Sequence, residues 1–436
     1  MNPATVTPLA PASIALALGL LLLAPLALAG LALINTGLGR SRSAAQSLLG
    51  SLVVLATAVV AFALVGAAFA GLTPGHVLTF DSKTWSLIGA DPLALTGFAA
   101  ATPHAQLALL FECLAVALAV LIPWGSGADR LSLPAGAVIA AVFAVLVFPL
   151  AVHWTWGSGW LAALGVNFSL GSGFLDPGGA ASIHMLGGLT ALAVVWLVGP
   201  RRNKFPREGL ATAMPGHNVV YVLFGCLIAL VGWLAFNMAG ALLWLADAPS
   251  TLPVVAVNTL LSAAAALIAA FSVTRIRFGK PDASLCANGW LAGLVTSSAC
   301  AALVSPLIAI FTGFVIGIAT PLLVELFELA LSIDDPSGGL AVHAAGGLWG
   351  LLAAGLFASS SGHFAGQFPS QLTAQLVGIA ALLGLLFPLT YLFFALANRI
   401  LPFRVEPDGE RLGMDLHELG GNAYPEFVVH RDDSYR

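Results

Sequence analysis

Charged residues are scarce in this chain. They make up 8% of its 436 residues, whereas a soluble globular protein carries roughly 25%. Hydrophobic residues make up 59%, so most of the surface must face lipid or other apolar helices. The formal net charge is −4, and no basic stripe or basic run mixed with aromatics occurs, which argues against a nucleic-acid partner.

Cysteine is also rare. The four cysteines, Cys113, Cys226, Cys286 and Cys300, are scattered and form no C-x-x-C pair, so neither a disulfide framework nor a metal site is expected. The sequence also lacks a nucleophile–base pair, a phosphate-binding loop and a cluster of metal ligands. It therefore predicts a protein that is not an enzyme and holds no cofactor.

Long apolar runs dominate the chain. A membrane helix needs about 20 residues, and eleven runs reach that length: 11–36, 45–72, 104–124, 131–156, 178–199, 217–245, 253–274, 285–303, 306–330, 338–360 and 372–397. No positive segment precedes the first run, so it is interpreted as a membrane helix rather than a cleaved signal peptide.

The distribution of positive charge fixes a predicted orientation. With the N-terminus outside, 15 of the 16 Lys and Arg residues fall on the inner side, and only Lys83 lies outside. The prediction is an all-α integral membrane protein of eleven transmembrane helices, with its N-terminus outside and its C-terminus inside. Residues 1–397 form the membrane domain, and residues 398–436 form a cytosolic tail.

Two similar segments recur five spans apart. Residues 176–189 read DPGGAASIHMLGGL and residues 335–348 read DPSGGLAVHAAGGL. Because five is odd, the two copies enter the membrane from opposite faces, which predicts inverted repeats at about 11–199 and 217–360, followed by a final helix at 372–397. Such repeats place a substrate site near the midplane, where the halves meet.

Each copy carries one histidine, His184 or His343, about 12 Å along the helix from its Asp. The two rings should approach each other around the pseudo-two-fold axis. Burial disfavours imidazolium, so two neutral rings would offer a donor and an acceptor to a small guest but would reject a naked cation. No third ligand is near enough in sequence for zinc. The alternative is a structural hydrogen bond between helices.

Other residues in these segments have structural interpretations as well. Asp followed by Pro is a favourable helix start, so the structural alternative for Asp176 and Asp335 is that they only start helices, as N-caps. The glycine pairs at 187–188 and 346–347 are expected to allow close helix packing.

Several motifs, in order along the chain, resemble the ammonium transporter family (Amt/Mep/Rh), and its bacterial Amt branch most closely. These are AGLALINTGLGRSRS after the first span, HWTWGSGWLAALG, LDPGGAASIHMLGGL, PGHNVV with GWLAFN, GKPDASLCANGWLAGLV, IDDPSGGLAVHAAGGLWG, and RVEPDGERLGMDLHELGGNAYPEF in the tail. The resemblance implies an eleven-helix homotrimer with one pore per subunit. It also implies that ammonium is recruited outside and loses its proton, after which ammonia and the proton cross separately past the twin histidines.

The resemblance also implies roles for individual residues. Trp156 would hold ammonium by cation–π attraction, Phe236 would be one ring of a phenylalanine gate, and Trp233 would line the outer vestibule. Asp176 would support the outer site from behind, and Phe111 aligns with the first ring of the family's F-x-x-x-F motif.

The sequence departs from the family pattern at four positions: Ala115 replaces the gate phenylalanine, Gly240 a small hydroxyl residue, Leu419 a histidine and Gly421 a glutamate. Glu112 stands where the family tends to have a neutral Gln. One hypothesis is that Glu112 supplies the cation attraction lost with the missing ring. The alternative is a carboxyl group that is protonated or paired within the bundle.

The predicted function is ammonium/ammonia transport across the cytoplasmic membrane, with lipid around the chain and methylammonium as a further test substrate. One alternative is a sensor that binds ammonium and conducts little. Another is a conduit for a different small neutral gas or amine. The family also implies a cytosolic PII-type signalling partner at the inner face.

Overall fold

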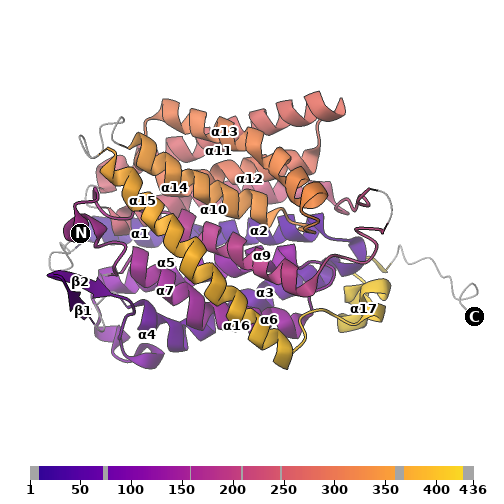
Figure 1. Cartoon of the computed structure of the whole chain (residues 1–436), viewed down its shortest axis with the longest axis horizontal. Coiled ribbons are helices and arrows are strands. Elements are labelled where there is room, and N and C mark those ends of the chain that lie inside the picture. Colours follow the sequence, from indigo (N-terminus) through magenta and orange to yellow (C-terminus); the bar gives the residue numbers. More distant parts are fainter. Residues whose placement is uncertain are drawn as a thin grey trace, which may run out of the picture.

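The computed structural model describes residues 9–71, 77–157, 159–207, 210–245, 248–358 and 368–425. Residues 426–436, the end of the predicted tail, lie outside this part. The described chain is a bundle of roughly aligned helices (Figure 1). Its first half contains α1 (Pro11–Leu23), α2 (Pro25–Leu38), α3 (Ala44–Ala61), α4 (Ala67–Ala70), α5 (Pro103–Ser126), α6 (Leu133–Val142), α7 (Phe148–Thr155), α8 (Leu164–Phe168), the π-helix η7 (Ala180–Met185) and α9 (Leu186–Val198).

The second half contains α10 (Val219–Trp244), α11 (Ala248–Phe278), α12 (Ala283–Cys300), α13 (Pro306–Glu325), the π-helix η9 (Leu340–Ala344) and α14 (Ala345–Phe357). It is followed by α15 (Ser370–Ala381), α16 (Phe387–Ile400), α17 (Pro407–Leu412) and the π-helix η11 (Asp415–Leu419). Further π-helical turns join α3 to α4, α6 to α7 and α15 to α16, so each of these pairs forms one continuous helical segment.

Ten helical segments of the described chain are long and apolar enough to cross a membrane. They match ten of the eleven predicted runs; the remaining run, 285–303, corresponds to α12. This helix has 18 residues, but polar side chains including Asn288, Thr296, Ser297 and Ser298 lower its apolar character. All four are buried, so protein rather than lipid surrounds them. The chain is a multi-pass membrane protein, and eleven spans stay a prediction.

Local sequence signals start several helices. Thr102 is the N-cap of α5 and Ser132 is the N-cap of α6. Their side chains accept hydrogen bonds from backbone N–H groups in the first turns of these helices. Asn218 and Asp282 do the same for α10 and α12. These side chains satisfy N–H groups that have no partner within the helix, which explains why the helices begin where they do.

One element departs from the all-α prediction. β1 (Val77–Phe80) and β2 (Lys83–Ser86) form an antiparallel hairpin, with Val77 opposite Ser86. The hairpin lies in the long connection between the second and third spans, where the sequence has no spanning apolar run. We call the end of the bundle that carries this hairpin the hairpin end, and the end that carries residues 398–425 the tail end (Figure 1).

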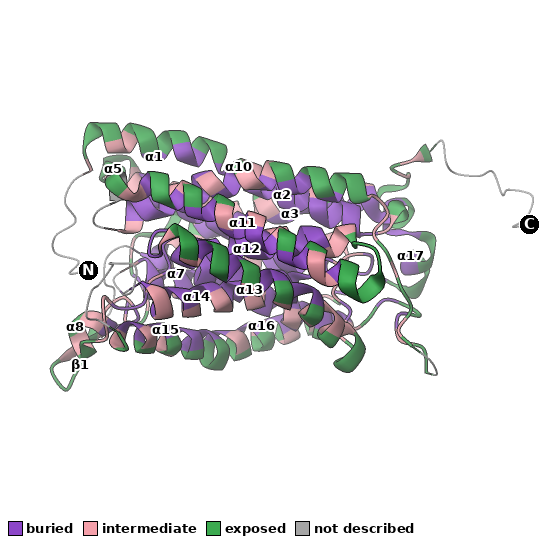
Figure 2. Ribbon diagram, turned by 90° about the horizontal axis from the view of Figure 1, so that it is seen from above, coloured by how far each residue is buried: buried purple, intermediate pink, exposed green. Residues whose placement is uncertain are grey.

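The two halves pack against each other through α2 and α10, the first long helices of the two predicted repeats. A methyl group on Gly225 would lie 2.7 Å from the backbone oxygen of Gly30, so only glycine permits this approach. Buried residues fill the space between the helices, while exposed residues lie on their outward faces (Figure 2). Those outward faces carry many Leu, Val, Ile and Phe side chains, as expected of a lipid-facing surface.

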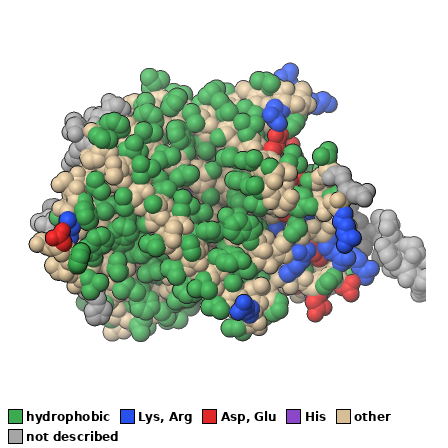
Figure 3. Space-filling view, in the orientation of Figure 1, with side chains coloured by type: hydrophobic (Ala, Val, Ile, Leu, Met, Phe, Trp, Pro, Cys, Tyr) green, Lys and Arg blue, Asp and Glu red, His purple; other side chains and the backbone are tan. Residues whose placement is uncertain are grey.

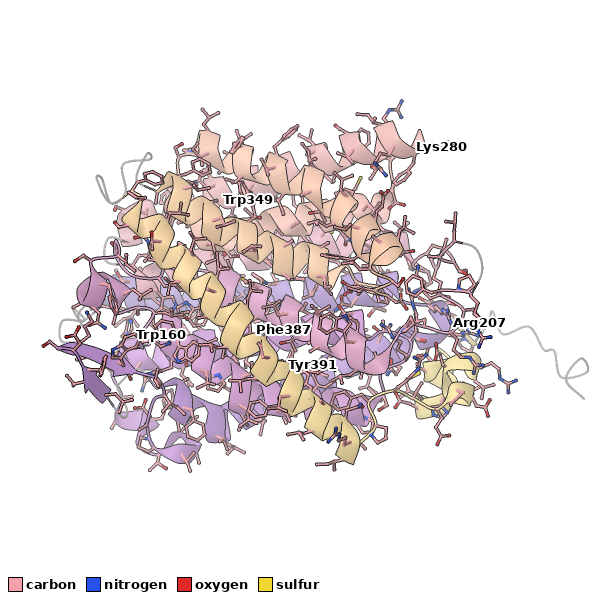
Figure 4. All side chains as sticks on the ribbon, in the orientation of Figure 1. Trp160, Arg207, Lys280, Trp349, Phe387 and Tyr391 are labelled. Carbon is pink, nitrogen blue, oxygen red and sulfur yellow. The ribbon has the colours of Figure 1, made fainter. Side chains whose placement is uncertain are left out.

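Charged side chains collect at the ends. In Figure 3, Lys and Arg gather mainly at the tail end, and the belt between the ends is largely hydrophobic. Lys280 and Arg207 both lie toward the tail end in Figure 4, whereas Trp160 lies near the hairpin. This distribution is the one on which the predicted orientation rests.

A buried ion cluster closes the tail end. Asp334 accepts hydrogen bonds from Nε and Nη2 of Arg201 at 3.0 and 2.8 Å, and Arg201 also reaches Asp129 at 3.2 Å. Arg130, which is fully buried, donates to the backbone oxygen of Asp334 at 2.7 Å. Burial would raise the pKa of Asp334, but the charges of Arg130 and Arg201 and the hydrogen bonds from Arg201 lower it to about 2. Burial lowers the pKa of Arg130 to about 10, and the charge of Asp334 opposes that shift.

The tail folds back onto the core of the same chain. The carboxylate of Asp415 accepts hydrogen bonds from the backbone N–H groups of Ala45 and Gln46, in the first turn of α3. Glu418 accepts from the N–H of Leu133, the first residue of α6, at 2.9 Å. Two tail carboxylates therefore cap two helices of the bundle.

Candidate functional site

The two predicted histidines occupy equivalent local structures. His184 lies in η7 and His343 in η9, and each of these π-helical turns leads into a regular helix, α9 or α14. A π-helical turn at this point in both repeats is consistent with a functional site, where such turns are frequent. The sequence gives no signal for the π geometry itself.

The aspartates that precede the histidines anchor these turns. Asp176 accepts hydrogen bonds from the N–H groups of Ala181 and Ser182 at 3.0 and 2.9 Å, and from the Ser182 hydroxyl group at 2.8 Å. Asp335 accepts from the N–H of Leu340 at 2.8 Å. Each aspartate side chain therefore meets N–H groups at the start of its turn, as expected of a residue that starts a helix. The N-cap residues themselves are Gly179 and Gly339, so neither aspartate is the N-cap.

The structure brings the two imidazole rings together, as the repeats predict. Nδ1 of His184 and Nδ1 of His343 lie 3.3 Å apart, and the ring centroids are separated by 5.3 Å at an interplanar angle of 28°. Their exposed fractions are 1% and 3%, so both rings lie inside the protein. One Nδ1 can donate a hydrogen bond to the other, which leaves both Nε2 atoms free to face other groups.

Glycines of each repeat make this approach possible. A methyl group on Gly188 would lie 2.4 Å from the backbone nitrogen of Ala344, beside His343. A methyl group on Gly347 would lie 2.5 Å from the backbone oxygen of Ala180, in the turn that carries His184. Gly188 and Gly347 hold equivalent positions in the two copies, so the contacts are reciprocal. The predicted packing role of these glycines is confirmed.

Trp233 lies beside His184. It stacks on His184, with centroids 5.1 Å apart and an angle of 12°, and it is only 1% exposed. Its Nε1 donates to the Ser298 hydroxyl group at 3.2 Å. Trp233 precedes Phe236 by about one turn of α10 and so lies deeper in the bundle. In the structure Trp233 supports the plane of the His184 ring, and its role at an outer vestibule stays a prediction.

Four aromatic rings form a cluster toward the hairpin end. The ring centroids of Phe111 and Phe236 are 4.4 Å apart. Phe111 and Trp156 form a T-shaped pair with centroids 5.1 Å apart. Trp244 lies parallel to Trp156, at 5.7 Å and 4°, and 6.0 Å from Phe111. We call Phe111, Trp156, Phe236 and Trp244 the aromatic cluster. Three of these four were predicted from the sequence.

Asp176 connects the aromatic cluster with the His184 turn. Its backbone oxygen accepts a hydrogen bond of 2.6 Å from Nε1 of Trp156, while its carboxylate caps η7. A single residue therefore fixes both the indole ring and the turn that carries the histidine. This is a position behind the cluster, in line with the supporting role implied by the family resemblance.

Two of the four departures from the family pattern, Gly240 and Ala115, differ in their surroundings. Gly240 has no room for a side chain: an added methyl group would lie 2.0 Å from the backbone oxygen of Pro177 and 3.2 Å from Cζ of Phe111. Ala115 is fully buried one turn deeper than Phe111 on the same face of α5. Phe111 itself contacts Phe236 at an interplanar angle of 43°, so a pair of phenylalanines forms here although position 115 lacks a ring.

Glu112 faces a different space from its neighbour Phe111. It is 5% exposed and lines a cavity of about 220 Å³ between α5 and the connection at residues 91–101, together with Asp91, Ala105 and Leu109. None of the four aromatic rings lines this cavity. The structure thus places Glu112 next to Phe111 along the chain but at a cavity that the aromatic cluster does not line.

Two residues near the cluster had no predicted role. Trp244 contacts the rings of Phe111 and Trp156. His104 meets Trp244 edge-on at 5.9 Å, and its Nε2 lies 3.1 Å from the backbone oxygen of Leu243. The sequence contains one signal for Trp244: with Phe236 and Gly240 it follows a four-residue spacing, which puts all three on one face of α10.

An apolar helical bundle that buries two imidazoles next to an aromatic cluster defines a multi-pass membrane protein with an internal polar site. The chain belongs to the ammonium transporter family: the model described as Ammonium Transporter Family matches residues 15–424. This is a family of transporters rather than of enzymes.

Individual relatives agree over most of the chain. It is 32% identical over 417 residues to ammonium transporter Amt2 of Archaeoglobus fulgidus, covering 92% of this chain and 85% of that protein. It is 29% identical to the ammonium transporter of Bacillus subtilis, with 92% and 95% covered. Among solved structures, a sensor Amt protein superposes with a TM-score of 0.82 at 26% identity, covering 93% of this chain and 98% of that one. Mep2 of Candida albicans, at 24% identity and a TM-score of 0.78, shares the fold.

Proposed function

We propose that this protein carries ammonium/ammonia across the cytoplasmic membrane, with the N-terminus outside and the tail inside. Ammonium would be recruited at the aromatic cluster and lose its proton there. Ammonia and the proton would then pass His184 and His343 separately. The observation that carries this proposal is the buried Nδ1–Nδ1 contact of 3.3 Å between histidines from the two inverted copies.

The aromatic cluster has the chemistry to attract a cation before it loses its proton. The ring centroids of Phe111, Trp156 and Trp244 lie 5.1–6.0 Å from each other. A cation over such a ring gains about 0.5–2 kcal/mol, depending on how far it is desolvated. This suits recruitment, because the attraction is too weak to trap the ion.

The histidine pair suits an uncharged guest. Moving a small ion from water into a medium of low dielectric has an idealised cost on the order of 20 kcal/mol. No carboxylate hydrogen-bonds to either imidazole among the described residues, so nothing there offsets that cost. Ammonia avoids the penalty and can both donate to and accept from neutral imidazoles.

The proposal is tested by ammonium-dependent current through the purified protein in liposomes. His184→Ala and His343→Ala should each reduce the current to the level of protein-free liposomes. His417→Asn, an exposed tail histidine, is the matched control and should leave the current unchanged. Full current in both pore variants, with equal amounts of folded protein, would exclude the proposed path. His184→Asn, which keeps a polar side chain of similar size, checks for loss of folding.

A sensor that conducts little is the second candidate function. The similarity to a solved sensor Amt protein favours it, as do Ala115, Gly240 and the altered tail positions Leu419 and Gly421. Saturable ammonium binding to the purified protein without any ammonium-dependent current would support the sensor. Comparing methylammonium with ammonium in the same liposomes tests the remaining alternative, a conduit for another small amine or gas.

Glu112 is proposed to raise the local concentration of cations near the aromatic cluster from its own cavity. Its carboxyl group, together with that of Asp91, gives that cavity an acidic lining. Glu112→Gln should then weaken the apparent ammonium affinity measured from transport currents and leave thermal stability unchanged. Glu406→Gln, at an exposed tail position, is the control. An affinity equal to that of the unmodified protein would show that Glu112 has no part in recruitment.

The assembly and partners implied by the family are proposed here as well. We propose a homotrimer with one pore per subunit, and a PII-type protein that docks at the tail end. The domain division at residue 397 fits this view, because the tail that follows covers the inner end of the bundle through Asp415 and Glu418. Mass measurement of the purified protein in lipid nanodiscs tests the trimer.

A further inference from the structure

Four arginines converge on one cavity at the tail end. The cavity has a volume of about 310 Å³ and is lined by Arg40, Arg42, Arg202 and Arg411, with Met214 and Glu410 among the remaining lining residues. These residues come from three segments that are distant in sequence: the turn between α2 and α3, the connection between α9 and α10, and the tail helix α17. The cavity is therefore the joint between the tail and the membrane domain.

Acidic groups do not balance these arginines inside the cavity. Both carboxylate oxygens of Glu410 are already engaged, one by the backbone N–H of Arg202 at 2.6 Å and the other by Arg404 at 2.7 Å. Arg411 pairs with Asp408 at 3.3 Å, but both side chains are more than 70% exposed, and such pairs contribute little. With Glu410 as its one acidic group against four arginines, this lining carries an excess of positive charge.

The guanidinium groups have weak acceptors. Arg42 and Arg202 donate to backbone oxygens, of Arg411 at 2.8 Å and Pro407 at 3.2 Å. Arg40 donates to the sulfur of Met214 at 3.1 Å and lies 3.9 Å from Asp129, a carboxylate that Arg201 also uses. Several N–H groups of these arginines therefore have no acceptor among the described residues and can meet a stronger one.

The electrostatic setting favours an anion. Burial lowers the pKa of Arg40, the charge of Asp129 opposes this, and the charges of Arg201 and Arg42 lower it further. Crowding of like charges is unfavourable, and a multiply charged anion among them would relieve it. Guanidinium forks match the oxygens of a phosphate group in geometry as well as in charge.

We propose that this cavity binds a phosphate-bearing anion that fastens the tail to the membrane domain. The phosphate could belong to a small soluble molecule or to a lipid headgroup, and the chemistry recognised is the same. Because α17 supplies part of the lining, an anion in the cavity would hold the tail against the core. Without the anion, the tail would be held only by its other contacts, such as those of Asp415 and Glu418. The site thus offers a means by which a cytosolic anion acts on the transport domain.

The test uses the full chain and measures thermal stability, because a ligand that binds only the folded state raises the melting temperature. In detergent, inorganic pyrophosphate should raise the melting temperature of the unmodified protein above that in sodium chloride of equal ionic strength. In nanodiscs, a mixture of phosphatidylglycerol and phosphatidylcholine should raise it above pure phosphatidylcholine if the source is a lipid headgroup. A response to pyrophosphate alone identifies a soluble ligand.

The double variant Arg42→Gln/Arg202→Gln should bind pyrophosphate at least about tenfold more weakly, because each lost charge-assisted hydrogen bond contributes about 1.5–3 kcal/mol. Arg275→Gln removes an exposed arginine at the end of α11, outside the cavity, and should respond like the unmodified protein. Should the double variant not fold, Arg411→Gln alone serves, because its side chain is largely exposed. No response in either arm, or an equal response in the cavity variant, overturns the proposal.

Discussion

Trp244 shows how a single side chain can complete a site that the motifs only outline. It lies parallel to Trp156 at 5.7 Å and closes the aromatic cluster, and its Nε1 has no hydrogen-bond partner among the described residues although it is buried. An unpaired indole N–H can donate to the lone pair of ammonia but not to ammonium. The ring face and the N–H group could thus act on different protonation states of one substrate.

Two substitutions of Trp244 separate the contribution of its ring face from that of its N–H group. Trp244→Ala should weaken apparent ammonium affinity roughly 2- to 30-fold, the range that a cation–π contribution of about 0.5–2 kcal/mol allows. Trp244→Phe should restore affinity, since the ring face remains. Liposome currents at varied ammonium concentration measure both. Trp196→Ala, at a tryptophan that is 53% exposed on α9, is the control. Unchanged affinity in the alanine variant would remove Trp244 from the site.

Gly240 is a second case where the neighbourhood of one residue decides the outcome. Restoring the family's hydroxyl group by Gly240→Ser would place Cβ 2.0 Å from the Pro177 oxygen, so the backbone before η7 must shift. We expect a loss of about 1–3 kcal/mol, as for other overpacked positions, and a lower melting temperature. Gly384→Ser, where nothing lies within 4 Å of the new atom, is the matched control. Equal melting temperatures for the two variants would contradict this.

Between elements, the buried ion cluster makes stability depend on pH. Because its pKa is lowered, Asp334 contributes its full stabilisation at any pH above 3.8, the ordinary pKa of the group. This contribution is lost as the pH falls toward about 2. The difference corresponds to about 2 kcal/mol. Asp334 lies directly before the second histidine segment and pairs with Arg201, which follows α9, and with Arg130, which follows α5. Its ionised form therefore holds together segments from the two halves of the chain.

The corresponding prediction compares variants across pH. Asp334→Asn should lower the melting temperature at neutral pH. The difference in the free energy of unfolding between this variant and the unmodified protein should narrow by about 2 kcal/mol between pH 4 and pH 2. Thermal unfolding followed by tryptophan fluorescence measures the gap. Asp408→Asn, at a carboxyl group that is 76% exposed, should show no such narrowing. A gap for Asp334→Asn that stays constant with pH would mean that this carboxyl group is not held ionised by the two arginines.

At the scale of the whole molecule, the tail is part of the folded unit rather than an appendage. Asp415 caps α3 and Glu418 caps α6, and these two contacts join residues that lie far apart in the sequence. The same carboxylate of Asp415 accepts from the N–H of Ala423, which fixes the tail's own turn. The tail is therefore positioned to influence the first turns of α3 and α6 at the tail end of the bundle.

Releasing the tail should leave the membrane domain intact. Asp415→Ala removes the acceptor for the N–H groups of Ala45, Gln46 and Ala423, so we expect faster tryptic cleavage after Arg411 while the core stays resistant. Gel analysis of a digestion time course measures the rate. Glu406→Ala, also in the tail but exposed, should be cleaved as slowly as the unmodified protein. Identical rates for Asp415→Ala would show that the caps do not hold the tail.

The sequence determined the architecture to a large extent. Apolar run lengths gave ten segments that the structure contains, because a lipid-facing helix must be apolar along its whole length. The repeated Asp-Pro, His and Gly-Gly-Leu pattern, separated by an odd number of spans, predicted that His184 and His343 would meet. The hairpin at Val77–Ser86 was missed, since a two-stranded element in a connection leaves no apolar period long enough to detect.

Only the tertiary structure decided how the remaining side chains are used. The depth of Trp233, the separation of Glu112 from the aromatic cluster, the inclusion of Trp244 and the convergence of Arg42, Arg202 and Arg411 depend on how helices rotate and which distant segments they meet. Membrane helices are apolar nearly all round, so periodicity does not reveal which face turns inward. Composition therefore fixed what could enter the membrane, and packing between helices fixed which side chains face the site.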